Sequence, residues 1–151
     1  MKYMTAAQAV QLIESGDSIY IQGSTSVPEV LSQALADRGN ELKDVTVYAA
    51  FAVGRCEAPY CKPEYKDAFN VKSLFVANNV RRWLADGYGS TIPAFLGEIP
   101  GLFRDGTLPV DAVFLNVSPP NDEGYCSFGI SADLAVSANI PEEYVWNVLD
   151  Y

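Results

Sequence analysis

The sequence of 151 residues contains no histidine, and this absence excludes several kinds of site. Histidine is the usual general base beside a serine or cysteine nucleophile, so a self-contained Ser-His or Cys-His hydrolase is not expected. Cysteine is scarce as well, with only Cys56, Cys61 and Cys126. Their odd number argues against a disulfide framework, and their spacing is not that of a zinc site. We therefore expect reduced thiols and no metal.

Basic residues are few, because 10 Lys and Arg stand against 19 Asp and Glu and leave a formal net charge of −9. An acidic surface repels phosphates, so nucleic acid is not expected as a partner. No apolar run reaches the ~18 residues of a membrane-spanning helix. Residues 1–8 also lack the basic and apolar pattern of a signal peptide. These absences predict a cytoplasmic protein without membrane association.

The hydrophobic patterning that is present predicts an α/β fold. Apolar residues make up 49% of the chain and charged residues 19%, which is ordinary for a globular domain of this size. Runs of β-branched and aromatic residues predict strands over 18–22, 45–51, 71–77, 111–117 and 144–149. Helical spacing predicts helices after Thr5 and Ser26, and over 78–84, 100–105 and 131–138. Such alternation is typical of a single domain with a mostly parallel sheet and helices on both faces.

Two helix starts have the pattern of a capping box, in which two side chains bind each other's backbone N–H groups. One pairs Thr5 with Gln8, and the other pairs Ser26 with Glu29. The second box follows a turn of small residues, Gly23, Ser24 and Thr25.

Ligands of open parallel sheets bind beyond the carboxyl ends of the strands, so the loops there are the candidate site. The turn at residues 23–26 could present N–H groups and a helix dipole to an anion or a developing oxyanion. The alternative is a tight turn without a ligand, because the glycine pattern of phosphate loops is missing. In residues 91–100, Glu98 is either a buried carboxylate at a helix start or a pocket residue.

The loop over residues 118–129 is long, and a loop of this length in a compact domain is usually functional or disordered. Its prolines and aromatic residues favour an ordered conformation. Asp122 and Glu123 are adjacent, so they are interpreted as solvated surface charges rather than as a paired acid and base. The residues alone therefore predict an α/β domain with a candidate anion-accepting cleft, and name no reaction.

Several short segments, in this order along the chain, carry a resemblance to a known family. They are Ser-Gly-Asp at 15–17, Glu-Leu-Lys-Asp-Val at 41–45, the segment 93–103, Leu-Pro-Val-Asp at 108–111, and Val-Ser-Pro-Pro with Gly-Tyr-Cys-Ser-Phe-Gly within 117–129. Together they resemble the N-terminal domain of the acetyl-CoA hydrolase / 4-hydroxybutyrate CoA-transferase family. The likeness predicts a CoA-transferase N-terminal-like α/β domain over 1–138 and a divergent tail over 139–151.

The resemblance implies an enzyme of two similar α/β domains with the active site between them. Such enzymes move coenzyme A from an acyl-CoA to a free carboxylate through a glutamate that attacks the thioester. That glutamate belongs to the second domain, and no position in this chain matches its motif. None of Glu57, Glu64, Glu98 and Glu123 is therefore assigned a catalytic role, and the chain alone is expected to be inactive. The substrate is a coenzyme A ester, with no tightly bound cofactor.

By position in the resemblance, two loops line the acyl side of the substrate cleft. The lining residues are Gly23, Ser24, Thr25, Ser118, Pro119, Pro120, Gly124, Tyr125, Ser127, Phe128 and Gly129. The expected partners are an acyl-CoA, a small carboxylate and the missing C-terminal domain or a partner subunit. Self-association through the face meant for that domain is also expected. Two alternatives remain open: one subunit of a heteromeric CoA-transferase, or a non-catalytic binding or assembly module.

Overall fold

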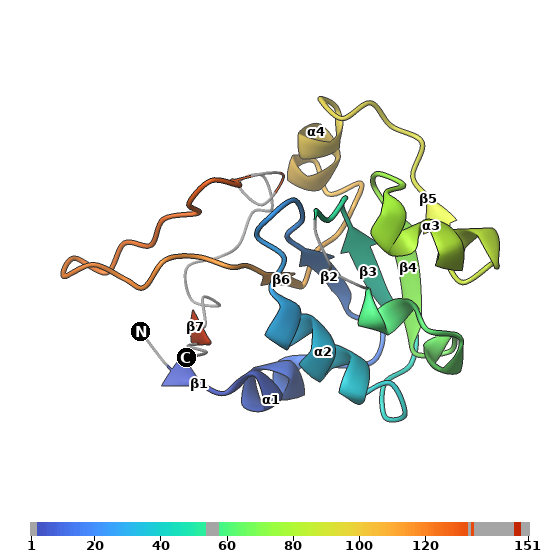
Figure 1. The fold of residues 1–151 in the computed structure, drawn as a ribbon, viewed down its shortest axis with the longest axis horizontal. Coiled ribbons are helices and arrows are strands. Elements are labelled where there is room, and N and C mark those ends of the chain that lie inside the picture. Colours follow the sequence, from blue (N-terminus) through green and yellow to red (C-terminus); the bar gives the residue numbers. More distant parts are fainter. Residues whose placement is uncertain (1–2, 54–57, 133, 135–146, 149–151) are drawn as a thin grey trace.

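A parallel five-stranded sheet forms the centre of the protein, in the order β5-β4-β3-β2-β6 (Figure 1). The structure is a computed structural model, and it describes residues 3–53, 58–132, 134 and 147–148. The strands of this sheet are β2 (Ser18–Ile21), β3 (Val45–Ala49), β4 (Phe69–Ser73), β5 (Ser90–Thr91) and β6 (Ala112–Phe114). All four pairings between neighbouring strands are parallel, which confirms the predicted sheet.

Helices connect the strands, as parallel pairing requires. They are α1 (Ala6–Ala9), α2 (Glu29–Asp37), α3 (Asn78–Ala85) and α4 (Ile99–Arg104), with 3-10 turns η1 (Val10–Leu12), η2 (Pro59–Cys61) and η3 (Pro63–Tyr65). A separate short parallel pair joins β1 (Tyr3–Met4) to β7 (Asn147–Val148). None of the helices in the described part of the chain is long and apolar enough to span a membrane.

Alternating side chains of the strands divide the core into two layers. Ile19 and Ile21 of β2 belong to one cluster, together with Leu35 of α2. Tyr20, between them, belongs to the other cluster, together with Phe103 of α4. Because successive residues of a strand point to opposite faces, one apolar strand supplies both layers. The prediction of helices on both faces of the sheet is therefore confirmed.

Three aromatic rings hold α4 against its face of the sheet. Phe103 makes edge-to-face contacts with Tyr20 and Tyr48, at centroid distances of 5.4 and 5.7 Å. Burial is the main cause that raises the pKa of Tyr48 above its usual value. These contacts position α4, and with it the loop that precedes it, at the carboxyl edge of the sheet.

The two predicted capping boxes have opposite outcomes. The first is confirmed, because Gln8 N–H donates to Thr5 Oγ1 at 3.2 Å and Thr5 N–H donates to Gln8 Oε1 at 3.0 Å. The second is wrong, because α2 starts with Pro28 as its N-cap and no side chain caps it. Ser26 is buried in the preceding turn, where its N–H donates to the Gly23 carbonyl at 3.2 Å. It therefore lies two residues before the N-cap position, too early to cap the helix.

Strand bounds also differ from the prediction. β3 ends at Ala49 and β6 covers only Ala112–Phe114, while β5 was not among the predicted strands. The last predicted strand is present as Asn147–Val148, but it pairs with β1 rather than with the main sheet. Most of the predicted helix over 131–138 and most of the tail over 139–151 lie outside the described residues, as does Cys56.

The two described cysteines are expected to differ sharply in reactivity. Cys61 is buried, and burial raises its pKa to about 12, so at pH 8 it stays a neutral thiol. Cys126 is only partly buried. Because the thiolate is the nucleophile, a Cys56→Ser protein at pH 8 should give one native thiol with a disulfide reagent and a second only after unfolding. Cys126→Ser should remove the native reaction; modification of Cys61 in the folded protein would contradict the assignment.

Candidate functional site

The three predicted loops lie together at the carboxyl edge of the sheet. Residues 23–26 follow β2, residues 92–98 lead from β5 to α4, and residues 118–129, here called the signature loop, lie beyond β6. All five main strands are parallel, so these loops emerge at the same edge. In Figure 1 α4 lies above the sheet, and the orange signature loop extends away from the body to the left.

The turn after β2 is held by backbone hydrogen bonds. Ser24 has a left-handed backbone with φ 58°, which is uncommon for a residue with a side chain. Its N–H donates to the Phe51 carbonyl at 2.6 Å, and its carbonyl accepts from Val53 N–H at 2.9 Å. The Ser26 N–H is engaged by Gly23 as described above. Two of the amides that could face an anion are thus used by the protein, as the tight-turn alternative requires.

The signature loop folds back on itself as an ordered arm. Ser118 N–H donates to the Ser127 carbonyl at 2.8 Å, and Ser127 N–H donates to Ser118 Oγ at 2.9 Å. Nearer the tip, Asn121 N–H donates to the Tyr125 carbonyl, and Asn121 Oδ1 accepts from the N–H groups of Glu123 and Tyr125. Gly124 completes the tip with a positive φ of 86°. The arm is therefore ordered by its own polar groups.

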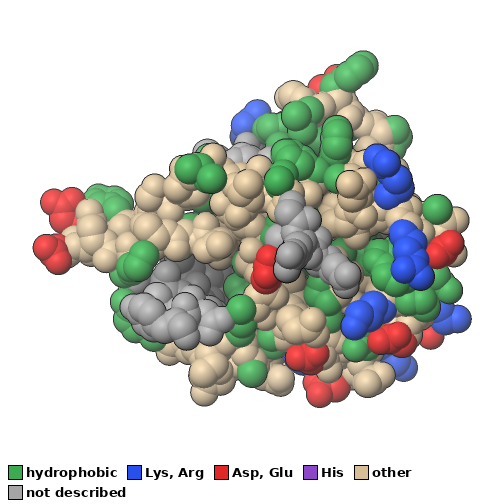
Figure 2. All heavy atoms as spheres, viewed as in Figure 1, with side chains coloured by type: hydrophobic (Ala, Val, Ile, Leu, Met, Phe, Trp, Pro, Cys, Tyr) green, Lys and Arg blue, Asp and Glu red, His purple; other side chains and the backbone are tan. Residues whose placement is uncertain are grey.

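Most of this arm lies away from the turn after β2. Tyr125 is 71% exposed, and Asp122 and Glu123 are exposed beside it. Acidic side chains are visible at the far left end of Figure 2, as expected for solvated charges. Phe128, by contrast, is partly buried and packs against the core layer below α4. The predicted lining residues are thus split between a base at the sheet and a projecting tip.

One residue that the sequence patterns did not single out joins this base to β2. Gln22 follows the last residue of β2 and is completely buried. Its Oε1 accepts from Asn116 N–H at 2.7 Å, and its Nε2 donates to the Ser131 carbonyl at 2.6 Å. The only signal in the sequence is a polar amide directly after an apolar strand.

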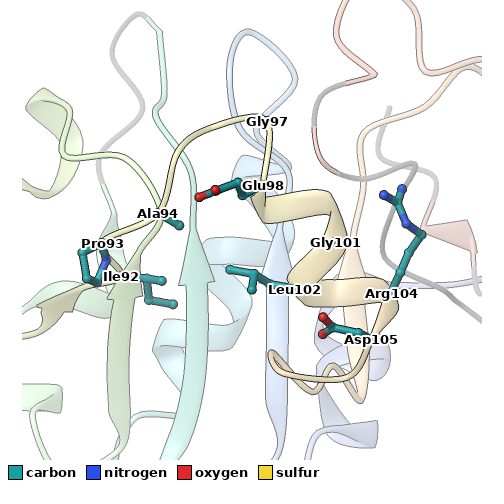
Figure 3. Close-up of a pocket in the computed structure, with 9 residues that line it drawn as sticks. All are labelled: Ile92, Pro93, Ala94, Gly97, Glu98, Gly101, Leu102, Arg104 and Asp105. Carbon is teal, nitrogen blue, oxygen red and sulfur yellow. The ribbon is translucent and has the colours of Figure 1, made fainter.

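The loop before α4 borders a shallow hollow of about 540 Å³ (Figure 3). It is lined by Ile92, Pro93, Ala94, Gly97, Glu98, Gly101, Leu102, Arg104 and Asp105. Glu98 is the N-cap of α4, and its Oε2 accepts from Phe95 N–H at 3.1 Å. Of the two interpretations of Glu98, a helix-start position and a pocket position both hold, but the residue is exposed rather than buried.

Large apolar side chains are exposed on the same edge. We call Val53, Phe75, Phe95 and Leu96 the apolar rim, since each is at least half exposed and lies on a loop beyond β3, β4 or β5. Phe75 stacks edge-on against Phe51 at 5.6 Å. Figure 2 shows hydrophobic side chains gathered at the top of the molecule, around α4 and the loop before it. Exposed apolar groups of this kind are typical of interaction surfaces.

The site thus belongs to a class of α/β domains in which ligands meet the loops beyond a parallel sheet. Within the described residues, no three Cys, Asp or Glu side chains come together as a metal-binding group. The chain belongs to the acetyl-CoA hydrolase/transferase N-terminal domain family, whose model matches residues 1–143. This confirms the family resemblance and its α/β fold.

Known relatives agree with this assignment. The chain is 33% identical over 132 residues to the 4-hydroxybutyrate coenzyme A transferase of Clostridium kluyveri, and the matched region covers 87% of this chain and 30% of that protein. It is 31% identical over 128 residues to the succinyl-CoA:acetate/propanoyl-CoA:succinate CoA transferase of Fasciola hepatica, and the matched region covers 83% of this chain and 26% of that protein. The chain thus spans less than a third of these relatives.

Solved structures match at the level of the fold as well. RipA from Yersinia pestis superposes with a TM-score of 0.79 and 26% identity, over 90% of this chain and 33% of that one. The 4-hydroxybutyrate CoA-transferase of Porphyromonas gingivalis gives a TM-score of 0.70 and 28% identity, over 91% of this chain and 30% of that one.

Proposed function

We propose that the chain forms one wall of the active site of an acyl-CoA:carboxylate CoA-transferase, of the 4-hydroxybutyrate or acetate CoA-transferase / acetyl-CoA hydrolase type. The family match over residues 1–143, together with the transferases similar to it, carries the proposal. The substrates would be an acyl-CoA and a small carboxylate.

The catalytic glutamate is proposed to come from a second domain or partner subunit. Three of the four glutamates without an assigned catalytic role are described, and their surroundings support this proposal. Glu64 lies in η3, ahead of β4 and so at the amino edge of the sheet. Glu98 is exposed and hydrogen-bonded to its own loop, and Glu123 lies near the tip of the arm. Glu57 lies outside the described residues.

The proposed chemistry is a covalent exchange in steps. The glutamate carboxylate of the second wall attacks the thioester carbonyl, and the thiolate of coenzyme A leaves, so that an acyl-glutamyl anhydride forms. The thiolate then attacks the glutamyl carbonyl and releases the free acid, which gives a glutamyl-CoA thioester. The acceptor carboxylate reverses both steps. The turn at 23–25 and the base of the signature loop are proposed to contact the acyl group from this side.

Isotope exchange between acetyl-CoA and labelled acetate tests the proposal. The purified chain is expected to give no exchange above a buffer blank, because it holds one wall only. Adding the separately produced C-terminal part of the Clostridium kluyveri transferase should restore exchange, whereas that part alone should stay silent. Exchange by the pure chain would show that a glutamate here is the nucleophile, and would overturn the assignment of that role to a second domain.

The exposed apolar rim also supports a second candidate function. A heteromeric transferase subunit would bury this rim against its partner, and a non-catalytic module would use it for binding or self-association. A chain that binds the added C-terminal part, as seen by co-elution, but never supports exchange would favour the non-catalytic module. Rapid exchange in the mixture would favour the subunit.

A further inference from the structure

Gln22 closes the base of the signature loop from the inside. The main-chain ladder between β2 and β6 ends with Gln22 N–H donating to the Phe114 carbonyl at 3.0 Å. Beyond that point the Gln22 side chain makes the connecting hydrogen bonds, to the Asn116 N–H before the loop and to the Ser131 carbonyl after it. Both contacts span about a hundred residues of sequence, at separations of 94 and 109. A single buried amide therefore clamps the two ends of the arm.

The chemistry of the clamp restricts which residue can serve. The Asn116 N–H needs an acceptor, and the Ser131 carbonyl needs a donor. A primary amide supplies one of each from the same side chain, whereas an apolar side chain of similar size supplies neither. Ser131 is itself buried, so an unpaired carbonyl there cannot turn to water without local opening.

Among the described residues, a few other contacts help to hold the direction of the arm. Its internal hydrogen bonds order the loop relative to itself, and Phe128 is its partly buried contact with the core layer below α4. Figure 1 shows the arm leaving the body beyond β6, next to the end of β2. Its orientation relative to the sheet thus depends strongly on its base.

We propose that Gln22 is a positioning residue that sets the direction of the signature loop against the carboxyl edge of the sheet. It acts through Asn116 and Ser131 rather than by touching the substrate. As a role in catalysis this rests on the proposed function, because the arm matters there only if it lines the acyl site.

The direction of the arm can be measured on the chain itself. In a Cys56→Ser protein, spin labels on Cys126 and on an introduced Gln33→Cys report the distance from the arm to the exposed face of α2, while buried Cys61 stays unlabelled. The parent is expected to give one narrow distance distribution. Gln22→Met should broaden it at least twofold, and Gln11→Met, the same change at an exposed glutamine of η1, should leave it unchanged.

Gln22→Glu separates the clamp from a general loss of stability. A neutral carboxyl group both donates and accepts, so it can replace the amide, but a carboxylate cannot donate to Ser131. Burial raises the pKa of such a group. The distribution should therefore be narrow near pH 5.5 and broad near pH 9, whereas the parent should not change between them. If Gln22→Met fails to fold, the comparison of Gln22→Glu at the two pH values still tests the role of Gln22.

Two outcomes would overturn the proposal: an unchanged distribution in Gln22→Met, or a distribution in Gln22→Glu that ignores pH. In the reconstituted exchange assay, Gln22→Met should raise the KM for the acyl-CoA or lower kcat at least tenfold, and Gln22→Glu should recover at low pH. If the parent chain supports no exchange, the proposed function fails, while the distance measurement still decides the role of Gln22.

Discussion

Replacing Phe103 by alanine is expected to lower the free energy of unfolding by about 3–5 kcal/mol, the usual cost of truncating a buried aromatic residue. Phe103 is 6% exposed and makes edge contacts with Tyr20 and Tyr48, which the smaller side chain would lose. A helix as short as α4 is not stable without packing, so its tie to the sheet should weaken as well. Urea unfolding followed by circular dichroism measures the change.

Phe95→Ala is the matched control for this experiment. Phe95 lies on the loop before α4 and is 79% exposed, so the same substitution should change stability by about 0.5 kcal/mol or less. It removes one member of the apolar rim, and association with the added C-terminal part should weaken instead. Similar losses of stability in both variants would mean that α4 is not held by Phe103.

Gly39→Ala is expected to destabilise the fold by about 1–3 kcal/mol, because the added methyl group has no room. An ideal Cβ at Gly39 would lie 2.2 Å from Cδ1 and 2.6 Å from Cε1 of Tyr65. The Tyr65 ring packs against the core and stands edge-on to Phe69 at 6.1 Å, so it cannot move aside cheaply. Thermal and urea unfolding both report the loss.

Two comparisons make the steric cause specific. Gly101→Ala in α4 meets no atom within 4 Å, so it should be neutral or stabilising by about 0.5–1 kcal/mol. In a Tyr65→Ala background the cost of Gly39→Ala should fall towards zero, since the clashing ring is gone. An undiminished cost there would place its origin in the backbone rather than in Tyr65.

The predicted strands succeeded where the hydrophobic pattern was strong. Ile19, Val47 and Val71 lie in apolar runs that could be buried only in a covered sheet, and all three are completely buried. β5 was missed because Ser90 and Thr91 are two exposed polar residues with no such pattern. They form a strand because Lys72 and Ser73 of β4 offer an open edge with which to pair. Pairing of this kind depends on the assembled sheet.

Some features of the candidate site could likewise be predicted from the sequence, and others could not. The Ser-Pro-Pro and Gly-Tyr-Cys-Ser-Phe-Gly segments identify the signature loop, and Asn121 is placed to order it because its partners lie within four residues. The projecting direction of the arm could not be predicted. It depends on Gln22, which the chain pattern presents as the polar end of a strand.

The alternation of strands and helices and the positions of the loops could be predicted from the sequence, because they depend on local composition and short-range periodicity. The family was indicated by the resemblance of short segments such as Ser-Pro-Pro and Gly-Tyr-Cys-Ser-Phe-Gly. The order of the strands, the short edge strand β5, the fit of Gly39 under Tyr65 and the clamp at Gln22 were decided only by tertiary structure. Each of these joins residues that are distant in the chain, and hydrogen bonds and steric contacts act between atoms that folding has brought together.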